Sequence, residues 1–174
     1  MSLRAVSVLA LALAGCSEGT PPSAPPPLDA GIAVAFSSVN AADHGLAEIV
    51  IEVVGVTALS DGGANVELGG AEDDINLVAI EGAPIDLVSG EAAAGEFTGL
   101  RVELAEEGFV RETPGSLSQD LVVTQTTVTA SGAFTVDEDA VTELELIMDL
   151  AGRLTFDDTT DTWRLDPRNL DLLN

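Results

Sequence analysis

Apolar side chains recur at every second position along much of this chain, and this alternation restricts its fold more than any other feature. The pattern is clearest in residues 49–53, 100–104 and 144–150, where Ile, Val, Leu and Met alternate mainly with Glu, Asp and Arg. In an extended strand this period places the apolar side chains on one face and the charged ones on the other, whereas a helix would spread both around its circumference. The pattern therefore predicts strands with one buried face.

Turn-forming residues separate these runs. Ser60-Asp61-Gly62-Gly63 predicts a hairpin loop between a strand that ends near Leu59 and a short strand at residues 65–68. Further breaks are expected at residues 69–70, 82–84, 89–90, 113–115 and 157–161. Short strands that recur roughly every 8–12 residues are typical of all-β folds. We expect an antiparallel β-sandwich with immunoglobulin-like or transthyretin-like layering, and at most one short helix, at residues 86–94.

The first residues have the pattern of an export signal. Arg4 gives a short basic region, and residues 5–14 (AVSVLALALA) form an uncharged apolar run. About ten apolar residues fit the core of a secretory signal peptide, whereas a membrane-spanning helix needs roughly 20. Residues 1–15 are therefore predicted to be a signal peptide that is removed from the mature protein.

The apolar run ends in Leu13-Ala14-Gly15-Cys16, which resembles the lipobox of bacterial lipoproteins. In that family a diacylglyceryl group is joined to the Cys sulfur, and cleavage before the Cys makes it the first residue. Cys16 is the only Cys in the chain, and it occupies the position that the motif requires. The resemblance implies a lipid anchor on Cys16 in the cell envelope. By the same resemblance, Ser17 in place of Asp favours the outer membrane.

Residues 16–30 are expected to be a linker behind the lipidated Cys16. Five of them are Pro, and such a stretch adopts an extended polyproline II conformation and does not pack. The folded domain is then expected to span residues 31–174, which is the size of one ordinary domain.

The charge and residue counts exclude several functional classes. The 174 residues include 30 Asp and Glu, 6 Arg and no Lys, for a formal net charge of -24. This charge argues against a nucleic acid partner and against binding to an anionic membrane surface. One Cys and one His exclude an internal disulfide and a zinc site built from thiolates or several imidazoles. We expect an acidic globular domain with no cofactor and no metal site.

Few residues are candidates for a functional site. His44 is expected to be solvated in a loop, and no G-x-S-x-G motif accompanies it, so we predict no catalytic role. Acidic clusters at residues 72–74, 137–139 and 157–161 are expected to be solvated loops, with calcium binding by the last of them as an alternative. Most of the large aromatic residues are expected in the core, although several on one exposed face would form a sugar-binding platform: Phe36, Phe97, Phe109, Phe134, Phe156 and Trp163.

Three segments resemble an uncharacterised lipoprotein domain family, catalogued as domain of unknown function 4382. They are residues 31–59, residues 75–78 with the motif AGEFTGLRVEL at 94–104, and the run from SGAFTV at 131–136 through LELIMDL at 144–150 to WRLDP at 163–167. Phe97 stands where this family usually has Tyr. The resemblance implies a β-sandwich in an exported, often lipid-anchored protein, and it implies no activity.

From these features we predict a lipid-anchored extracytoplasmic β-sandwich with a non-enzymatic binding or structural role in the envelope. Its membrane contact would be the lipid on Cys16, and its protein or glycan partner is not readable from the sequence. Two alternatives stay open: an extracytoplasmic carbohydrate-active hydrolase that uses paired carboxylates, and a calcium-stabilised adhesion module.

Overall fold

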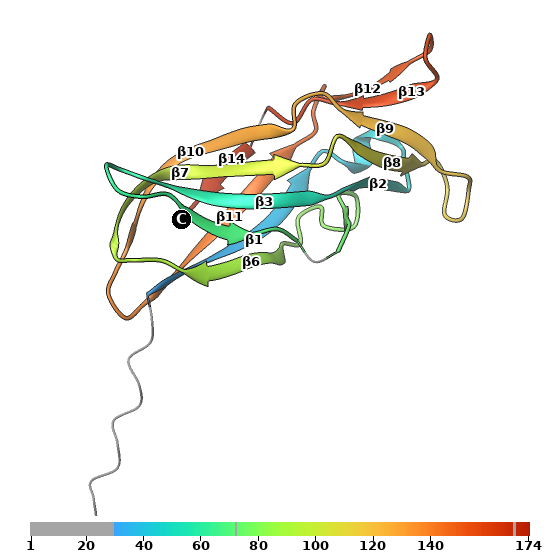
Figure 1. Ribbon diagram of the computed structural model, residues 1–174. Helices are drawn as coiled ribbons and strands as arrows, with labels where there is room; N and C mark the ends of the chain where they lie inside the picture. Colours follow the sequence, from blue (N-terminus) through green and yellow to red (C-terminus); the bar gives the residue numbers. More distant parts are fainter. Residues whose placement is uncertain (1–29, 72, 169) are drawn as a thin grey trace, which may run out of the picture.

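The computed structural model describes residues 30–71, 73–168 and 170–174, and its fold is all-β (Figure 1). The only helix among these residues is the single 3-10 turn η1 (Ala42–His44). The strands are β1 (Gly31–Val39), β2 (Glu48–Ile51), β3 (Val53–Ser60), β4 (Val66–Gly69), β5 (Ile75–Asn76), β6 (Ile85–Glu91), β7 (Gly95–Leu104), β8 (Glu107–Arg111), β9 (Gln119–Val123), β10 (Thr127–Val136), β11 (Val141–Asp149), β12 (Leu154–Asp157), β13 (Thr162–Leu165) and β14 (Leu170–Leu173).

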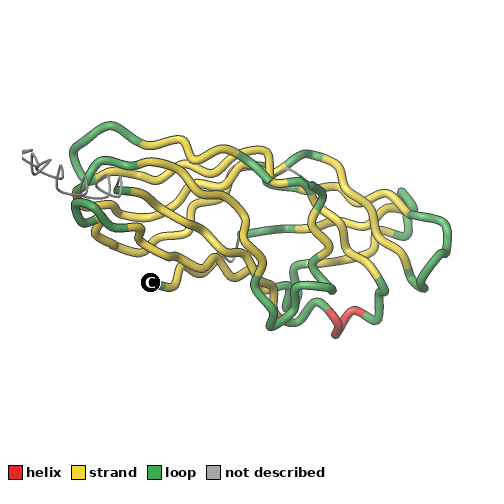
Figure 2. Tube along the Cα trace, turned by 90° about the horizontal axis from the view of Figure 1, so that it is seen from below, coloured by secondary structure: helices red, strands yellow, loops and turns green. Residues whose placement is uncertain are grey.

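The strands form three sheets. Sheet 1 has the strand order β14-β11-β1-β6, and sheet 2 has the order β10-β7-β3-β4. Sheet 3 has the order β12-β13-β9-β8-β2-β5. Three of its strands continue directly from strands of sheet 2, because β2 precedes β3, β8 follows β7 and β9 precedes β10 with only one to three residues between them. Sheet 3 therefore extends sheet 2 lengthwise, and the molecule is elongated (Figure 2).

Sheets 1 and 2 form a β-sandwich around a shared core. Phe36 and Leu146 of sheet 1 belong to the same cluster of buried side chains as Leu100 and Val102 of sheet 2. The edge strands of the two sheets lie side by side, β10 next to β14 and β4 next to β6. Burying these apolar faces against each other is the main driving force for this fold.

The predicted alternation is confirmed in β7 and β11, whereas in β2 Val50 is buried together with Ile49 and Ile51. In β11 the side chains of Leu144, Leu146 and Met148 are buried, while Glu143 and Glu145 lie on the outer face. The hairpin around Ser60–Gly63 is also confirmed, because it connects β3 to β4. At most one short helix is expected at residues 86–94, but residues 86–91 belong to β6 and residues 92–94 follow it without helical structure; Gly90 of β6 gives room to Leu68 of the neighbouring strand β4.

Two strand pairs are parallel, although an antiparallel sandwich was expected. β1 pairs with β11 over its full length, and β9 pairs with β13. Parallel partners are far apart in sequence because the chain must cross over between them. Alternation within a strand records which side chains are buried, but it carries no information about the direction of the neighbouring strand.

Candidate functional site

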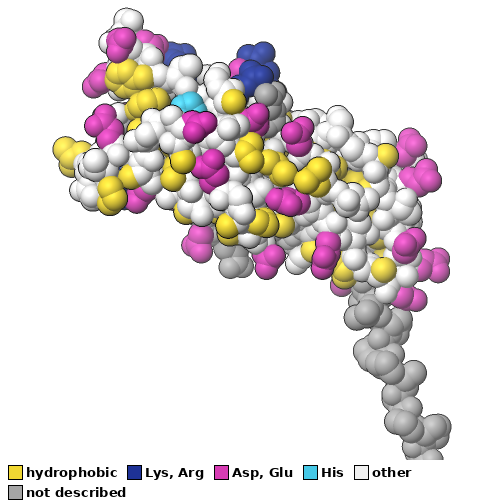
Figure 3. All heavy atoms as spheres, turned by 180° about the vertical axis from the view of Figure 1, so that it is seen from behind, with side chains coloured by type: hydrophobic (Ala, Val, Ile, Leu, Met, Phe, Trp, Pro, Cys, Tyr) yellow, Lys and Arg dark blue, Asp and Glu magenta, His cyan; other side chains and the backbone are white. Residues whose placement is uncertain are grey.

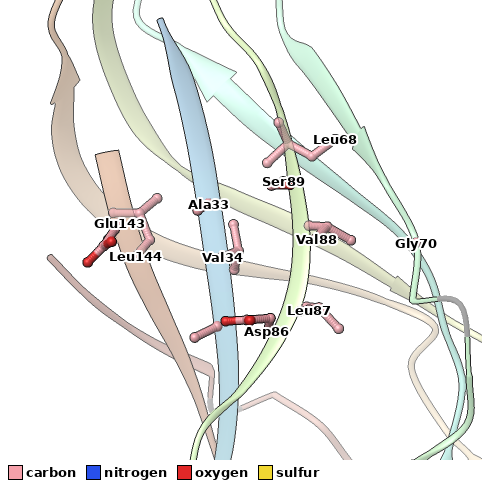
Figure 4. Close-up of a pocket in the computed structure, with 11 residues that line it drawn as sticks. Ala33, Val34, Leu68, Gly70, Asp86, Leu87, Val88, Ser89, Glu143 and Leu144 are labelled. Atoms are coloured by element: carbon pink, nitrogen blue, oxygen red, sulfur yellow. The ribbon is translucent and has the colours of Figure 1, made fainter. Parts of the chain in front are cut away.

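A hollow lies on the outer face of sheet 1 and continues toward β4. Its volume is about 680 Å³, which is within the usual range for small-molecule sites. The floor is formed by Ala33 and Ala35 of β1, whose small side chains point outward between the larger side chains of β11 and β6. Leu68 and Gly70 close the side toward β4 (Figure 4).

Two carboxylates line this hollow, but they do not face each other. Glu143 is the register partner of Ala33, and Asp86 is the register partner of Ala35. In Figure 4 the side chain of Asp86 lies over β1, whereas the carboxylate of Glu143 lies on the far side of β11. Both residues are exposed to solvent. A general acid is usually buried in its site, whereas both of these carboxylates are exposed.

Further along the outer face of sheet 1, two acidic side chains of β11 accept hydrogen bonds from β1 or from the residue that follows it. Ser37 donates a hydrogen bond from Oγ to Glu145 Oε1 at 2.6 Å, and Asn40 donates from Nδ2 to Asp149 Oδ1 at 2.7 Å. The backbone N–H of Ala151 also donates to Asp149. The hydrogen bond from Ala151, and after it the one from Asn40, lowers the pKa of the Asp149 carboxyl below its ordinary value. Asp149 therefore helps to fix the end of β11.

His44 is less solvated than predicted. It lies in η1 between β1 and β2, it is half-buried, and its Nε2 is 3.1 Å from the carbonyl oxygen of Leu150. This hydrogen bond connects the η1 loop to the residue that follows β11. His44 therefore has a structural contact.

In the acidic loop at residues 157–161, which was the candidate for calcium binding, the first carboxylate already has partners within the hairpin. Asp157 Oδ1 accepts a hydrogen bond from the backbone N–H of Thr159 at 3.0 Å, and Oδ2 is 3.2 Å from Arg164 Nε. Chiefly because of the Thr159 hydrogen bond, the pKa of the Asp157 carboxyl is lowered. Within residues 30–71, 73–168 and 170–174, no three His, Cys, Asp or Glu side chains are grouped so that they could hold a metal ion.

The aromatic residues are divided between the core and the far end of the molecule. Phe36, Phe97 and Phe134 are buried, as predicted, and the rings of Phe97 and Phe134 stack with centroids 5.1 Å apart. Phe156 and Trp163 instead come together on the β12–β13 hairpin, where Phe156 is 40% exposed. Both residues flank the predicted turn at 157–161, and the register of the hairpin brings them opposite each other.

Arginine side chains pair with acids across the structure. Arg101 Nε lies 3.6 Å from Glu103, Arg164 pairs with Asp157, and Arg168 pairs with Asp166 at 2.6 Å. On the face shown in Figure 3, Asp and Glu side chains are spread from end to end, whereas Arg side chains gather near one edge.

Cys16, the predicted lipid attachment site, lies outside the described residues, as do the predicted signal peptide and almost all of the linker. In the part of the chain that the structure covers, no helix is long and apolar enough to cross a bilayer. No protein-family model, curated protein or solved structure matches this chain.

Proposed function

We propose that this protein is a lipid-anchored extracytoplasmic lipoprotein whose β-sandwich has a non-enzymatic binding role. The motif Leu13-Ala14-Gly15-Cys16 supports the anchor, since the only thiol of the chain stands where the lipid would be attached. The position of β1 is consistent with this tether. The strand begins at Gly31, at the end of the molecule opposite the β12–β13 hairpin (Figure 1). We also propose membership of the lipoprotein domain family that residues 31–167 resemble.

The observation that most favours binding over catalysis is the arrangement of Asp86 and Glu143. A glycoside hydrolase needs two carboxyl groups that flank the bond to be cleaved, one of them with a raised pKa. Here the two carboxylates line one open hollow, but both are exposed and Glu143 is turned away from β1. A binding surface needs no such pair. An outer membrane location follows from Ser17 under the same proposal.

The lipid anchor is tested by expressing the full chain with its own signal in a bacterium that processes lipoproteins. We expect the mature protein to partition into the detergent phase and to begin at a Cys16 that carries the mass of a diacylglyceryl group. The Cys16→Ser variant should remain in the aqueous phase, whereas Ser17→Ala, a matched change one residue away, should still be lipidated. An unmodified thiol on a freely soluble wild-type product would contradict the proposal.

The alternative of a carbohydrate-active hydrolase is kept because Asp86 and Glu143 do line the same hollow. Its test is release of reducing ends from polysaccharides by the wild type and by the Asp86→Asn and Glu143→Gln variants. The binding proposal predicts no turnover by any of the three proteins. Turnover that both variants lose would instead establish the hydrolase.

A further inference from the structure

The β12–β13 hairpin carries an aromatic pair just beyond the edge of the core. Leu154 and Leu165 are register partners on the two strands, and both are buried. The next pair on the same face, toward the turn, is Phe156 and Trp163, with ring centroids 5.2 Å apart and planes inclined by 54°. Phe156 is 40% exposed and Trp163 is only partly buried. The apolar face of sheet 3 therefore continues outward as two aromatic rings that solvent can reach.

Trp163 is held in place by contacts from neighbouring strands. Its Nε1 donates a hydrogen bond of 2.7 Å to Gln119 Oε1 of β9, and Gln119 Nε2 is within 3.4 Å of Glu112 Oε1. The indole N–H is therefore already satisfied, and the ring keeps its orientation without a ligand. A fixed ring loses little conformational entropy on binding, which favours affinity.

The polar and charged groups around Phe156 and Trp163 favour one class of ligand. The turn between the two strands adds the hydroxyl groups of Thr159 and Thr160 and the exposed carboxylate of Asp158. Arg164, the only basic residue of the hairpin, is already paired with Asp157. The hairpin itself carries three Asp and one Arg, so its net charge is negative, which disfavours acidic polymers and anionic lipid surfaces. Exposed aromatic faces beside hydroxyls and carboxylates suit a neutral polyhydroxylated molecule, whose C–H groups pack on the rings while its hydroxyls form hydrogen bonds.

The location of the hairpin agrees with a recognition role. It lies at the end of the molecule opposite the start of β1, to which residues 1–30 connect (Figure 1). Leu117, in the loop before β9, is 91% exposed and lies two residues from Gln119. If the chain is tethered through Cys16, this end points away from the anchoring membrane.

We propose that the aromatic pair Phe156 and Trp163 is a binding site for a neutral carbohydrate. A pyranose ring would stack on the exposed face of Phe156 and on the edge of Trp163, and the polar groups of the turn would bond to its hydroxyls. The inference rests on the proposed binding role of the domain and names the ligand class for it.

The chain offers a direct probe of this site, because Trp163 is its only Trp and it contains no Tyr. The full chain, in a detergent without a sugar headgroup, is titrated with neutral oligosaccharides while Trp fluorescence is recorded. The probes are hexamers of β-1,4-linked glucose, β-1,3-linked glucose and β-1,4-linked mannose, with an oligogalacturonate as the acidic counterpart. We expect a saturable change with at least one neutral hexamer and none with the acidic one.

Two variants distinguish a site from a general effect. Phe156→Ala should weaken binding about tenfold, the scale expected for losing one aromatic contact. Phe156→Leu should also weaken binding, because Leu has no flat ring on which a sugar could stack. This variant keeps an apolar side chain next to the core, so the fold should be retained. The matched control is Phe109→Leu. Phe109 is the register partner of Asp120, which neighbours Leu121 in β9, so it lies on the opposite face of sheet 3 from Trp163. This control should bind like the wild type.

The proposal is overturned if none of the neutral hexamers gives a saturable change at millimolar concentration, if the acidic oligosaccharide binds equally well, or if Phe109→Leu loses as much affinity as Phe156→Leu. None of these results bears on the lipid on Cys16, which is measured by mass and phase partition. A failed carbohydrate site therefore stays distinguishable from a failed anchor.

Discussion

A methyl group on Gly99 would overlap with the carbonyl oxygen of Ala130 on the neighbouring strand. The two residues lie where β7 and β10 shift register, between Ser131 and Phe134, and Gly99 adopts a φ of 156°. The close approach lets both strands continue through the irregularity, so that Phe97 and Phe134 come opposite each other and stack. Gly is required here because only a residue without Cβ leaves room for the Ala130 carbonyl.

We therefore expect Gly99→Ala to lower the free energy of unfolding by about 1–3 kcal/mol, since β7 and the edge strand β10 must move apart. The matched control is Gly95→Ala in the same strand, because a Cβ there has nothing within 4 Å. Urea unfolding followed by circular dichroism measures both variants. Equal stability of the two variants would mean that the contact with Ala130 is not a constraint.

Removing the acceptor for Trp163 should destabilise the β12–β13 hairpin. In Gln119→Leu the indole N–H loses its 2.7 Å hydrogen bond, and a polar group left unsatisfied in a partly buried site costs about 1–3 kcal/mol. The exchange Gln119→Glu with Glu112→Gln keeps an acceptor oxygen for the indole and avoids two facing carboxylates, so it should retain most of the stability. Trp fluorescence during urea unfolding reports both changes at the site itself. A Leu variant as stable as the wild type would show that water replaces Gln119 at no cost.

Asp166 should contribute to stability only above strongly acidic pH. The hydrogen bond from Arg168, together with the charges of Arg168 and Arg153, lowers the pKa of the Asp166 carboxyl below its ordinary value of 3.8. A group with a lower pKa in the folded state stabilises the fold above the unfolded pKa, and this stabilisation is lost as the pH falls through the folded value. The loss is therefore expected below about pH 4.

The measurement is the free energy of unfolding of the wild type and Asp166→Asn between pH 2 and pH 7. The wild type should be more stable than the variant at neutral pH, and the difference should shrink below about pH 4. Asp171→Asn removes the same formal charge from an exposed position of β14 and serves as the control. A difference that is constant over the whole range would rule out the ionised Asp166 as its source.

Salt should raise the melting temperature of this protein. With a formal net charge of -24 and no Lys, repulsion among the carboxylates opposes folding. Because the Debye length falls from about 8 Å at physiological ionic strength to about 3 Å at 1 M, added salt screens this repulsion. Melting in sodium chloride and in potassium chloride should give the same upward trend. A triple variant that neutralises Asp86, Glu91 and Glu143 of sheet 1 should respond less, and a melt that salt leaves unchanged would refute the explanation.

The alternation in residues 100–104 and 144–150 was sufficient to predict strands and their buried faces, because side chains of a strand point to opposite sides whatever its partner is. In residues 49–53 it predicted the strand but not the burial of Val50. The hairpin at residues 60–63 was predicted as well, because the conformation of a Gly-rich turn is specified by a few neighbouring residues. The candidate site was not predicted. The outward-facing Ala33 and Ala35 show in the sequence only as small residues, and their place beside Glu143 depends on the pairing of β1 with β11.

By itself, the sequence determined the strand period, the acidic surface and the sole thiol at Cys16, because each of these is a property of single residues or of near neighbours. Only the tertiary structure decided that β1 runs parallel to β11, and that Asp86 and Glu143 line one hollow without facing each other. The residues in these relationships are far apart in the chain, and their positions in the sequence do not show that they meet in space. Which of them form depends on how the three sheets pack, and no local pattern encodes that packing.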